Sequence, residues 1–203
     1  MRRRGHLIVF EGIDGAGKTT QARLLQETLE RSGYRVKATK EPTESPAGER
    51  IRELAREGRR ESPEVETELF LRDRRSHVEK LIGPALEDGA VVISDRYYLS
   101  TVAYQGARGL DPELLLATCE EQFPVPDLAL VLGVTPAEGL RRISLRQRAV
   151  DPAFERIESL LAVGALFRAL TRPYVAHVGG EGSIDSVRES ILAEVGARTS
   201  LSR

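Results

Sequence analysis

The chain has 203 residues, and its 30 basic and 31 acidic side chains leave a formal net charge of -1 at pH 7. That length suits one substantial α/β domain, and the balanced charge argues against binding to nucleic acid through a general basic surface. A single cysteine excludes an internal disulfide framework, and the longest uncharged stretch, 97–107, is far shorter than the roughly 20 residues that span a bilayer. We therefore expect a cytoplasmic protein without a membrane or nucleic-acid partner.

Short apolar runs alternate along the chain with longer stretches of helical period, which is the pattern of βα units around a parallel sheet. Five strands are predicted, over 6–10, 34–39, 90–94, 128–134 and 174–178. Helices are predicted from a glycine-rich turn to Gly33, over 64–88 as one long or two abutting helices with a bend at Gly83-Pro84, and over 112–121, 136–146, 155–172 and 184–196. No repeat or linker divides the sequence. We expect residues 1–203 to form one three-layer α/β domain.

A phosphate-binding loop is predicted directly after the first strand. The segment fits the pattern G-x-x-x-x-G-K-[ST] and reads Gly12-Ile13-Asp14-Gly15-Ala16-Gly17-Lys18-Thr19. Its backbone N–H groups and the following helix N-terminus would cradle a polyphosphate. Lys18, one of only four lysines, would reach the β- and γ-phosphates, and the Thr19 hydroxyl would bind Mg²⁺. A structural glycine turn is the alternative, but eight matched positions in the right context favour the nucleotide loop.

The third predicted strand ends in Asp95-Arg96-Tyr97, at the sheet edge where open α/β sheets bind ligands. The Asp95 carboxylate there is suited to hold the water shell of Mg²⁺, and Arg96 to bridge two phosphates. A surface ion pair after a strand would have the same composition. The nearby phosphate loop favours the functional interpretation.

Phe70 and Arg74 lie four residues apart on a predicted helix and therefore share a face. A flat apolar ring and a guanidinium could stack on a base and donate to its edge. The spacing alone favours another interpretation, in which residues 71–75 form a solvated charged turn and Phe70 belongs to the core.

Four arginines fall within residues 141–148, namely Arg141, Arg142, Arg146 and Arg148. Such clustering is typical of an exposed helix end, and equally of a lid that closes cations over a transferring phosphoryl group. His6, His77 and His177 have no metal-binding spacing, so we expect them to be structural.

Taken in order, these segments resemble the bacterial thymidylate kinases, within the nucleoside monophosphate kinases of the P-loop fold. The resemblance runs from about residue 6 to 160 and rests on residues 10–20, Lys40-Glu41-Pro42, 48–52, Leu69-Phe70, Asp73-Arg74, 94–97, Ser100-Thr101, 103–105 and 155–158. It implies a five-stranded parallel sheet flanked by helices, with a lid over about 141–156. It also shifts the interpretation of Phe70 and Arg74 toward a base pocket.

The resemblance further implies ATP as the phosphoryl donor, dTMP as the acceptor and Mg²⁺ as the metal. ATP and the metal would be held by Gly12, Asp14, Gly15, Ala16, Gly17, Lys18, Thr19 and Thr20, with Thr19 and Asp95 on Mg²⁺. The acceptor would meet Asp14 at the sugar 3′-OH, Phe70 and Arg74 at the base, Arg96 at the phosphate, Ser100, Thr101 and Gln105 close by, and Tyr104 at the 2′ position. The catalytic residues implied are Lys18, Arg96, Asp14, Arg146 and Arg148. The lid arginines Arg146 and Arg148 are included because the loop carries Gly15-Ala16, where one family class places a basic residue.

The second strand is followed by Lys40-Glu41-Pro42-Thr43-Glu44, where the family often has Arg-Glu-Pro-Gly-Gly. Two glycines are thus replaced by side chains that restrict the backbone and add a charge near the acceptor. The family also implies a homodimer, with the helix over 64–88 as a plausible interface.

Two other functions remain open from the residues. One is a kinase for another nucleoside monophosphate or for a deoxynucleoside. The other is a P-loop switch that binds nucleotide without transferring phosphate. The segment 95–105 argues against the switch, because a switch does not need an acceptor site.

Overall fold

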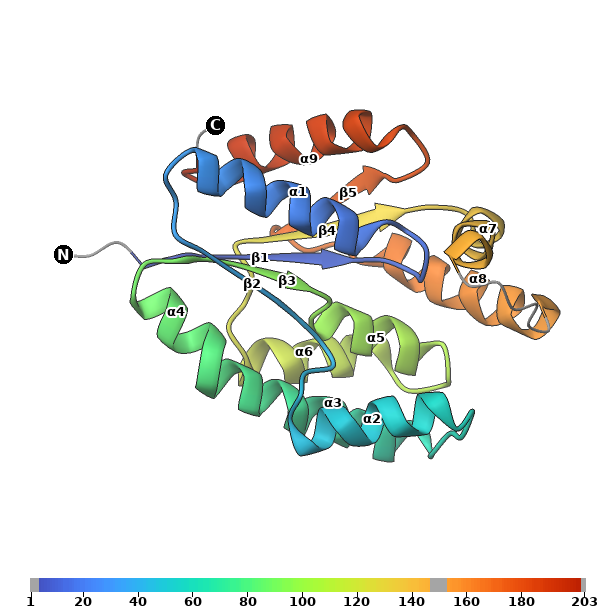
Figure 1. Cartoon of the computed structure of the whole chain (residues 1–203). Helices are drawn as coiled ribbons and strands as arrows, with labels where there is room; N and C mark the ends of the chain where they lie inside the picture. The colour runs from blue at the N-terminus through green and yellow to red at the C-terminus, as the bar shows by residue number, and fades with distance from the viewer. Residues whose placement is uncertain (1–3, 147–152, 202–203) are drawn as a thin grey trace.

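Five parallel strands form the centre of the fold, in the order β2-β3-β1-β4-β5 (Figure 1). The computed structural model describes residues 4–146 and 153–201. The strands are β1 (His6–Glu11), β2 (Val36–Lys40), β3 (Val91–Asp95), β4 (Leu128–Gly133) and β5 (Val175–Gly179). Every predicted strand is present, with its ends within two residues of the prediction.

Helices cover both faces of this sheet, which confirms the predicted three layers (Figure 1). Their bounds are α1 (Lys18–Arg31), α2 (Pro46–Arg56), α3 (Pro63–His77), the π-helical turn η1 (Val78–Ile82), α4 (Gly83–Glu87), α5 (Tyr98–Gly106), α6 (Pro112–Gln122), α7 (Pro136–Arg146), α8 (Ala153–Ala169) and α9 (Ile184–Arg198). No helix among the described residues is long and apolar enough to cross a membrane.

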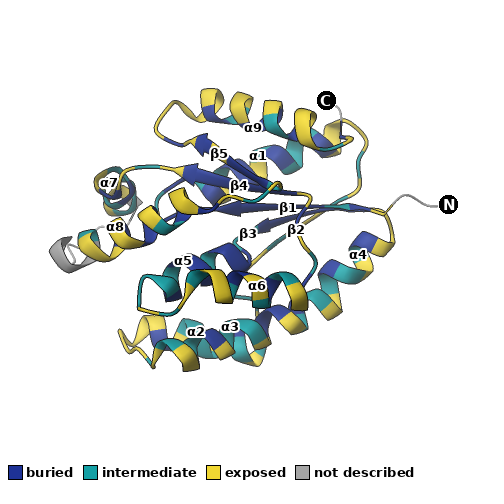
Figure 2. Cartoon of the chain, turned by 180° about the vertical axis from the view of Figure 1, so that it is seen from behind, coloured by how far each residue is buried: buried dark blue, intermediate teal, exposed yellow. Residues whose placement is uncertain are grey.

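The central strand β1 is buried on both faces. Leu7 and Val9 pack into a cluster with residues of α5, α6 and α8, while Ile8 and Phe10 pack into another with residues of α1 and α9. Figure 2 shows the same arrangement as dark strands between helices whose outer sides are exposed. Burial on two faces explains why the strand is a continuous apolar run instead of an alternating one.

Two helices were not predicted, and each has a physical reason. α2 begins at a serine cap, since the Ser45 hydroxyl accepts the Gly48 N–H, and Pro46 follows in the first turn. α5 has only nine residues, and six of them are buried, so few polar positions are left to mark a helical period. The predicted helix over 64–88 is continuous through η1, and this widened turn precedes Pro84, which cannot donate a backbone hydrogen bond.

Candidate active site

The parallel register brings the predicted motifs to one edge of the sheet. Phe10 of β1 pairs with Asp95 of β3, and Lys40 of β2 pairs with Asp95 from the other side. The carboxyl ends of these three neighbouring strands therefore coincide. The loops that follow them lie side by side at the edge where open α/β sheets bind ligands.

The phosphate loop has the backbone shape that its glycines permit. Gly15 has a φ of 81°, and a Cβ built on it would lie 2.2 Å from the carbonyl oxygen of Gly139 on α7. The Lys18 ammonium donates to the carbonyl oxygens of Gly12 at 2.9 Å and Ile13 at 2.8 Å. Burial, helped by the nearby Arg96 charge, lowers the pKa of Lys18 to about 8. The loop thus holds a buried cation at its centre.

The two predicted metal ligands are brought together. The Thr19 hydroxyl, at the start of α1, donates to Asp95 Oδ2 at 2.5 Å. Across residues 4–146 and 153–201, no three histidine, cysteine or acidic side chains gather as a metal cluster. A hydroxyl and a carboxylate fit Mg²⁺, which usually keeps several waters and shares its oxygen ligands with substrate phosphates.

Arg96 stands at the centre of the acceptor side in a strained conformation. Its φ is 74°, in the left-handed region that non-glycine residues rarely adopt. Its guanidinium donates to Asp14 Oδ1 at 2.6 Å and to the Ser100 hydroxyl at 2.9 Å, and lies 5.3 Å from the centre of the Tyr104 ring. The structure therefore groups four residues that the resemblance places at one acceptor site.

Glu11 belongs to this site and was not predicted to. Its fully buried carboxylate accepts the backbone N–H groups of Tyr97 at 2.9 Å and Ser100 at 3.2 Å, and the Ser100 hydroxyl at 2.5 Å. Burial raises its pKa to about 7. These bonds hold the chain just beyond the strained Arg96. The available signal was an acidic residue at the end of an otherwise apolar strand.

Arg74 on α3 is buried, with 1% of its surface exposed, so a solvated position for this residue is wrong. Its Nε and Nη2 donate to Glu41 Oε2 at 3.0 and 2.5 Å, and Nη2 also donates to the Thr101 hydroxyl at 3.1 Å. The guanidinium carbon lies 5.2 Å from the Tyr97 ring centre. Phe70, one turn earlier on α3, is half-buried.

Gln105 on α5 is buried and contacts Glu66 of α3, whereas Thr101 contacts Arg74. Its Nε2 donates to Glu66 Oε2 at 3.2 Å, and its Oε1 accepts from Arg108 at 3.0 Å. Arg108 also pairs with Glu66. The structure thus places Thr101 against Arg74, whereas Gln105 belongs to a neighbouring cluster between α3 and α5.

Thr43, one of the two residues that replace the glycine pair after β2, is held by Asp73 of α3. Asp73 accepts the Thr43 N–H at 2.8 Å, the Thr43 hydroxyl at 2.5 Å and the Ser45 hydroxyl at 2.6 Å. Gly48 packs so closely that an added Cβ would lie 2.1 Å from the Thr43 carbonyl oxygen. The Thr43 side chain therefore adds a tie between this loop and α3 that glycine could not provide.

The arginines of the predicted lid are only partly described. Arg148 lies outside the described residues, and Arg146 ends α7 without a described side chain. Arg141 and Arg142 both pair with Glu138, and Arg142 also donates to the carbonyl oxygen of Gly180 at 2.9 Å. α7 thus ties the phosphate loop, through Gly15 and Gly139, to the loop after β5.

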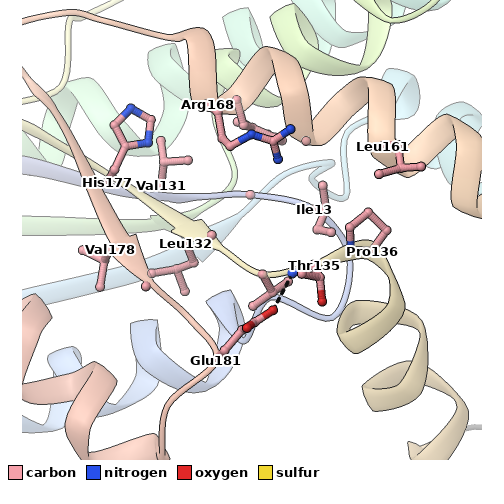
Figure 3. Close-up of a pocket in the computed structure, with 16 residues that line it drawn as sticks. Ile13, Val131, Leu132, Thr135, Pro136, Leu161, Arg168, His177, Val178 and Glu181 are labelled. Carbon is pink, nitrogen blue, oxygen red and sulfur yellow. Dashed lines mark hydrogen bonds between the residues drawn. The ribbon is translucent and has the colours of Figure 1, made fainter.

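An apolar cavity of about 680 Å³ adjoins the phosphate loop (Figure 3). Its walls come from the loop residues 12–13, the ends of β4 and β5, and α8. At one side the Glu181 carboxylate accepts the Thr135 N–H at 2.8 Å, as the dashed line shows. Phe70, Arg74 and Asp95 are not among its lining residues, so it is separate from the acceptor side.

Comparisons with known proteins agree with this geometry. The family model of thymidylate kinase matches residues 10–191. A thymidylate kinase from Desulfotalea psychrophila is 45% identical over 191 residues, or 94% of each chain. Another from Xanthomonas campestris pv. campestris is 48% identical over 191 residues, 94% of this chain and 83% of its own. A probable thymidylate kinase from Pyrococcus horikoshii is 44% identical over 200 residues, 95% of this chain and 96% of its own.

Proposed function

The chain belongs to the thymidylate kinase family, and from this membership we propose that it transfers the γ-phosphoryl group of ATP to dTMP, giving dTDP and ADP. The observation that carries the proposal is the meeting of two motifs at one sheet edge. Thr19 of the phosphate loop lies 2.5 Å from Asp95, beside Arg96 of the acceptor side. A donor phosphate and an acceptor phosphate would therefore be held next to each other.

Phosphoryl transfer to a phosphate needs positioning and charge neutralisation more than a strong base, because the acceptor oxygen is already anionic. Lys18 would bind the β- and γ-phosphates of ATP, and Arg96 would hold the acceptor phosphate. Mg²⁺ neutralises charge on phosphate oxygens when bound, and Thr19 and Asp95 are the residues suited to hold it. The glycines of the loop let its N–H groups reach the donor phosphates.

On the acceptor, Phe70 would stack on thymine, Arg74 would donate to a base carbonyl, and Asp14 would accept the sugar 3′-OH. The ion pair between Asp14 and Arg96 supports this role of Asp14, because it holds the residue that would bind the sugar next to the residue that would bind the acceptor phosphate. Tyr104, packed beside Arg96, would leave little room for a 2′-OH. Ser100, Thr101 and Gln105 complete the proposed surroundings.

We assign the cation that stabilises the transferring phosphoryl group to Arg146 and Arg148 of the proposed lid. The phosphate loop itself carries Gly15-Ala16 and supplies no cation other than Lys18. The proposal also includes a cytoplasmic homodimer that packs through α3, η1 and α4. Sedimentation equilibrium tests the dimer, and a monomer at micromolar concentration would contradict it.

A coupled ADP-release assay with dTMP, dUMP, CMP, AMP and thymidine tests the activity. We expect the highest kcat/KM with dTMP and little turnover of thymidine, since the transfer requires an existing 5′-phosphate. Similar rates on several monophosphates would contradict the choice of dTMP. ATP binding without turnover of any acceptor would indicate a nucleotide switch instead.

A further inference from the structure

We propose that Glu41 and His77 act as a positioning pair that fixes Arg74 so that it reads the 4-carbonyl of the acceptor base. This inference rests on the proposed function and extends it from Arg74 to two residues behind it. Glu41 follows β2, and His77 lies on α3 three residues after Arg74, so α3 presents both side chains to the same carboxylate. All three side chains are almost completely buried.

The hydrogen bonds define one continuous chain. His77 Nδ1 lies 3.0 Å from Glu41 Oε1, and His77 Nε2 lies 2.7 Å from the Thr39 hydroxyl. A carboxylate only accepts, so Nδ1 carries the proton that it donates to Glu41. In the neutral ring, Nε2 then accepts the Thr39 hydroxyl proton. The Thr39 hydroxyl thus donates to His77, and His77 donates to Glu41.

The same bonds restrict the guanidinium. His77 occupies Oε1 of Glu41, so Arg74 is left with Oε2, which receives both Nε and Nη2. Nη1 is buried and has no hydrogen-bond partner among the described residues. Without His77, the guanidinium could pivot to share both carboxylate oxygens, which is the usual fork geometry. His77 thus keeps one donor of Arg74 uncommitted.

An uncommitted buried donor selects the chemistry of its partner. Arginine has donors and no acceptor, so Nη1 is satisfied by a carbonyl and opposed by an amino group. Thymine and 5-methylcytosine differ in that respect at position 4. Arg74 is 1% exposed, and its guanidinium carbon lies 5.2 Å from the Tyr97 ring centre and 5.6 Å from the Phe123 ring centre. Phe70, one turn earlier on α3, is half-buried, so this turn of the helix is partly accessible beside the buried arginine. The pair would therefore favour 4-oxo over 4-amino pyrimidines.

Two amide variants at position 77 distinguish a role of His77 in orienting Arg74 from a role in packing alone. His77→Asn keeps an N–H close to the Nδ1 position, whereas His77→Gln moves its amide toward the Nε2 position and removes the donor to Glu41. We measure kcat and KM with dTMP and with 5-methyl-dCMP, and KM for ATP. Arg23→Gln is the surface control, because Arg23 is exposed on α1, outside the proposed dimer interface, and pairs with Glu27 of the same helix.

For His77→Gln and Glu41→Gln we expect kcat/KM for dTMP to fall about tenfold or more, mainly through KM, as for loss of a charged hydrogen bond. The value for 5-methyl-dCMP and the KM for ATP should change little, and His77→Asn should retain most of the preference. An equal fall in kcat/KM on both substrates, or identical behaviour of the Asn and Gln variants, would overturn the positioning role.

Should the His77→Gln variant not fold, Thr39→Val tests the same series of hydrogen bonds, because it removes the hydroxyl that donates to His77. It should lower the dTMP preference, and an unchanged preference would overturn the role. Failure of the proposed function is distinct, because the wild-type protein would then not phosphorylate dTMP.

Discussion

Glu11 at the end of β1 is a fully buried carboxyl that accepts three hydrogen bonds. Burial nevertheless raises its pKa from 4.5 to about 7. The hydrogen bonds favour the anion and the loss of hydration opposes it. Burial has the larger effect, so the carboxyl is held in a position that costs folding free energy once it ionises.

We predict that Glu11→Gln becomes more favourable for stability, relative to the wild-type chain, as pH rises. The carboxyl ionises near pH 4.5 in the unfolded chain and near pH 7 in the folded one. Between these values the free energy of unfolding of the wild-type protein falls as pH rises, whereas that of the Gln variant has no such contribution. The difference should reach at most about 3 kcal/mol and stay constant at higher pH. Urea unfolding from pH 4 to 8 measures it, with Glu121→Gln at an exposed position of α6 as control. A difference independent of pH would contradict the raised pKa.

Among the elements, α7 connects two parts of the site. Its Gly139 packs on the phosphate loop so closely that an added Cβ would lie 2.6 Å from the Asp14 carbonyl oxygen. Its Arg142 reaches the loop after β5. The helix that leads toward the predicted lid is thus in direct backbone contact with the nucleotide loop.

Gly139→Ala should therefore raise KM for ATP about tenfold or more, since overpacking typically costs about 1–3 kcal/mol and here displaces the loop backbone. Gly164→Ala is the matched control in α8. Among the described residues, its Cβ would approach Arg168 and Ile13, at 3.5 and 3.9 Å, which is ordinary contact. The control should bind ATP normally and unfold at a slightly higher temperature, because alanine favours a helix. Equal KM values for the two variants would show that α7 does not constrain the loop.

For the molecule as a whole, local sequence patterns predicted the layers, the strands and the phosphate loop, since each depends on a short run of residues. The family was identified in the same way and is confirmed. α5 was not predicted, because it is only nine residues long and six of them are buried, which leaves few polar positions to define a helical period. Glu11 and Glu41 were missed for another reason. Their partners, Tyr97 and Arg74, are distant in sequence, so only the folded chain reveals these contacts.

The proposed function assigns the catalytic cation to two arginines of the proposed lid. We predict that replacing both Arg146 and Arg148 with alanine lowers kcat about tenfold or more and leaves KM for dTMP nearly unchanged, as for contacts made only in the transition state. Steady-state kinetics measures this. Arg141→Ala serves as control, because Arg141 is exposed and pairs with Glu138. Unchanged turnover in the double variant would refute the assignment of the catalytic cation to these residues.

The edge position of β2 has a consequence for the behaviour of the protein at high concentration. Among the described residues, β2 is at the edge of the sheet and pairs with β3 alone, so its other side is where a strand from another molecule would add. Lys37 and Lys40, two of the four lysines in the chain, lie on this short strand and are exposed. Like charges on an edge strand repel an identical strand from a second copy. Lys37 and Lys40 therefore disfavour edge-to-edge association of two sheets through β2.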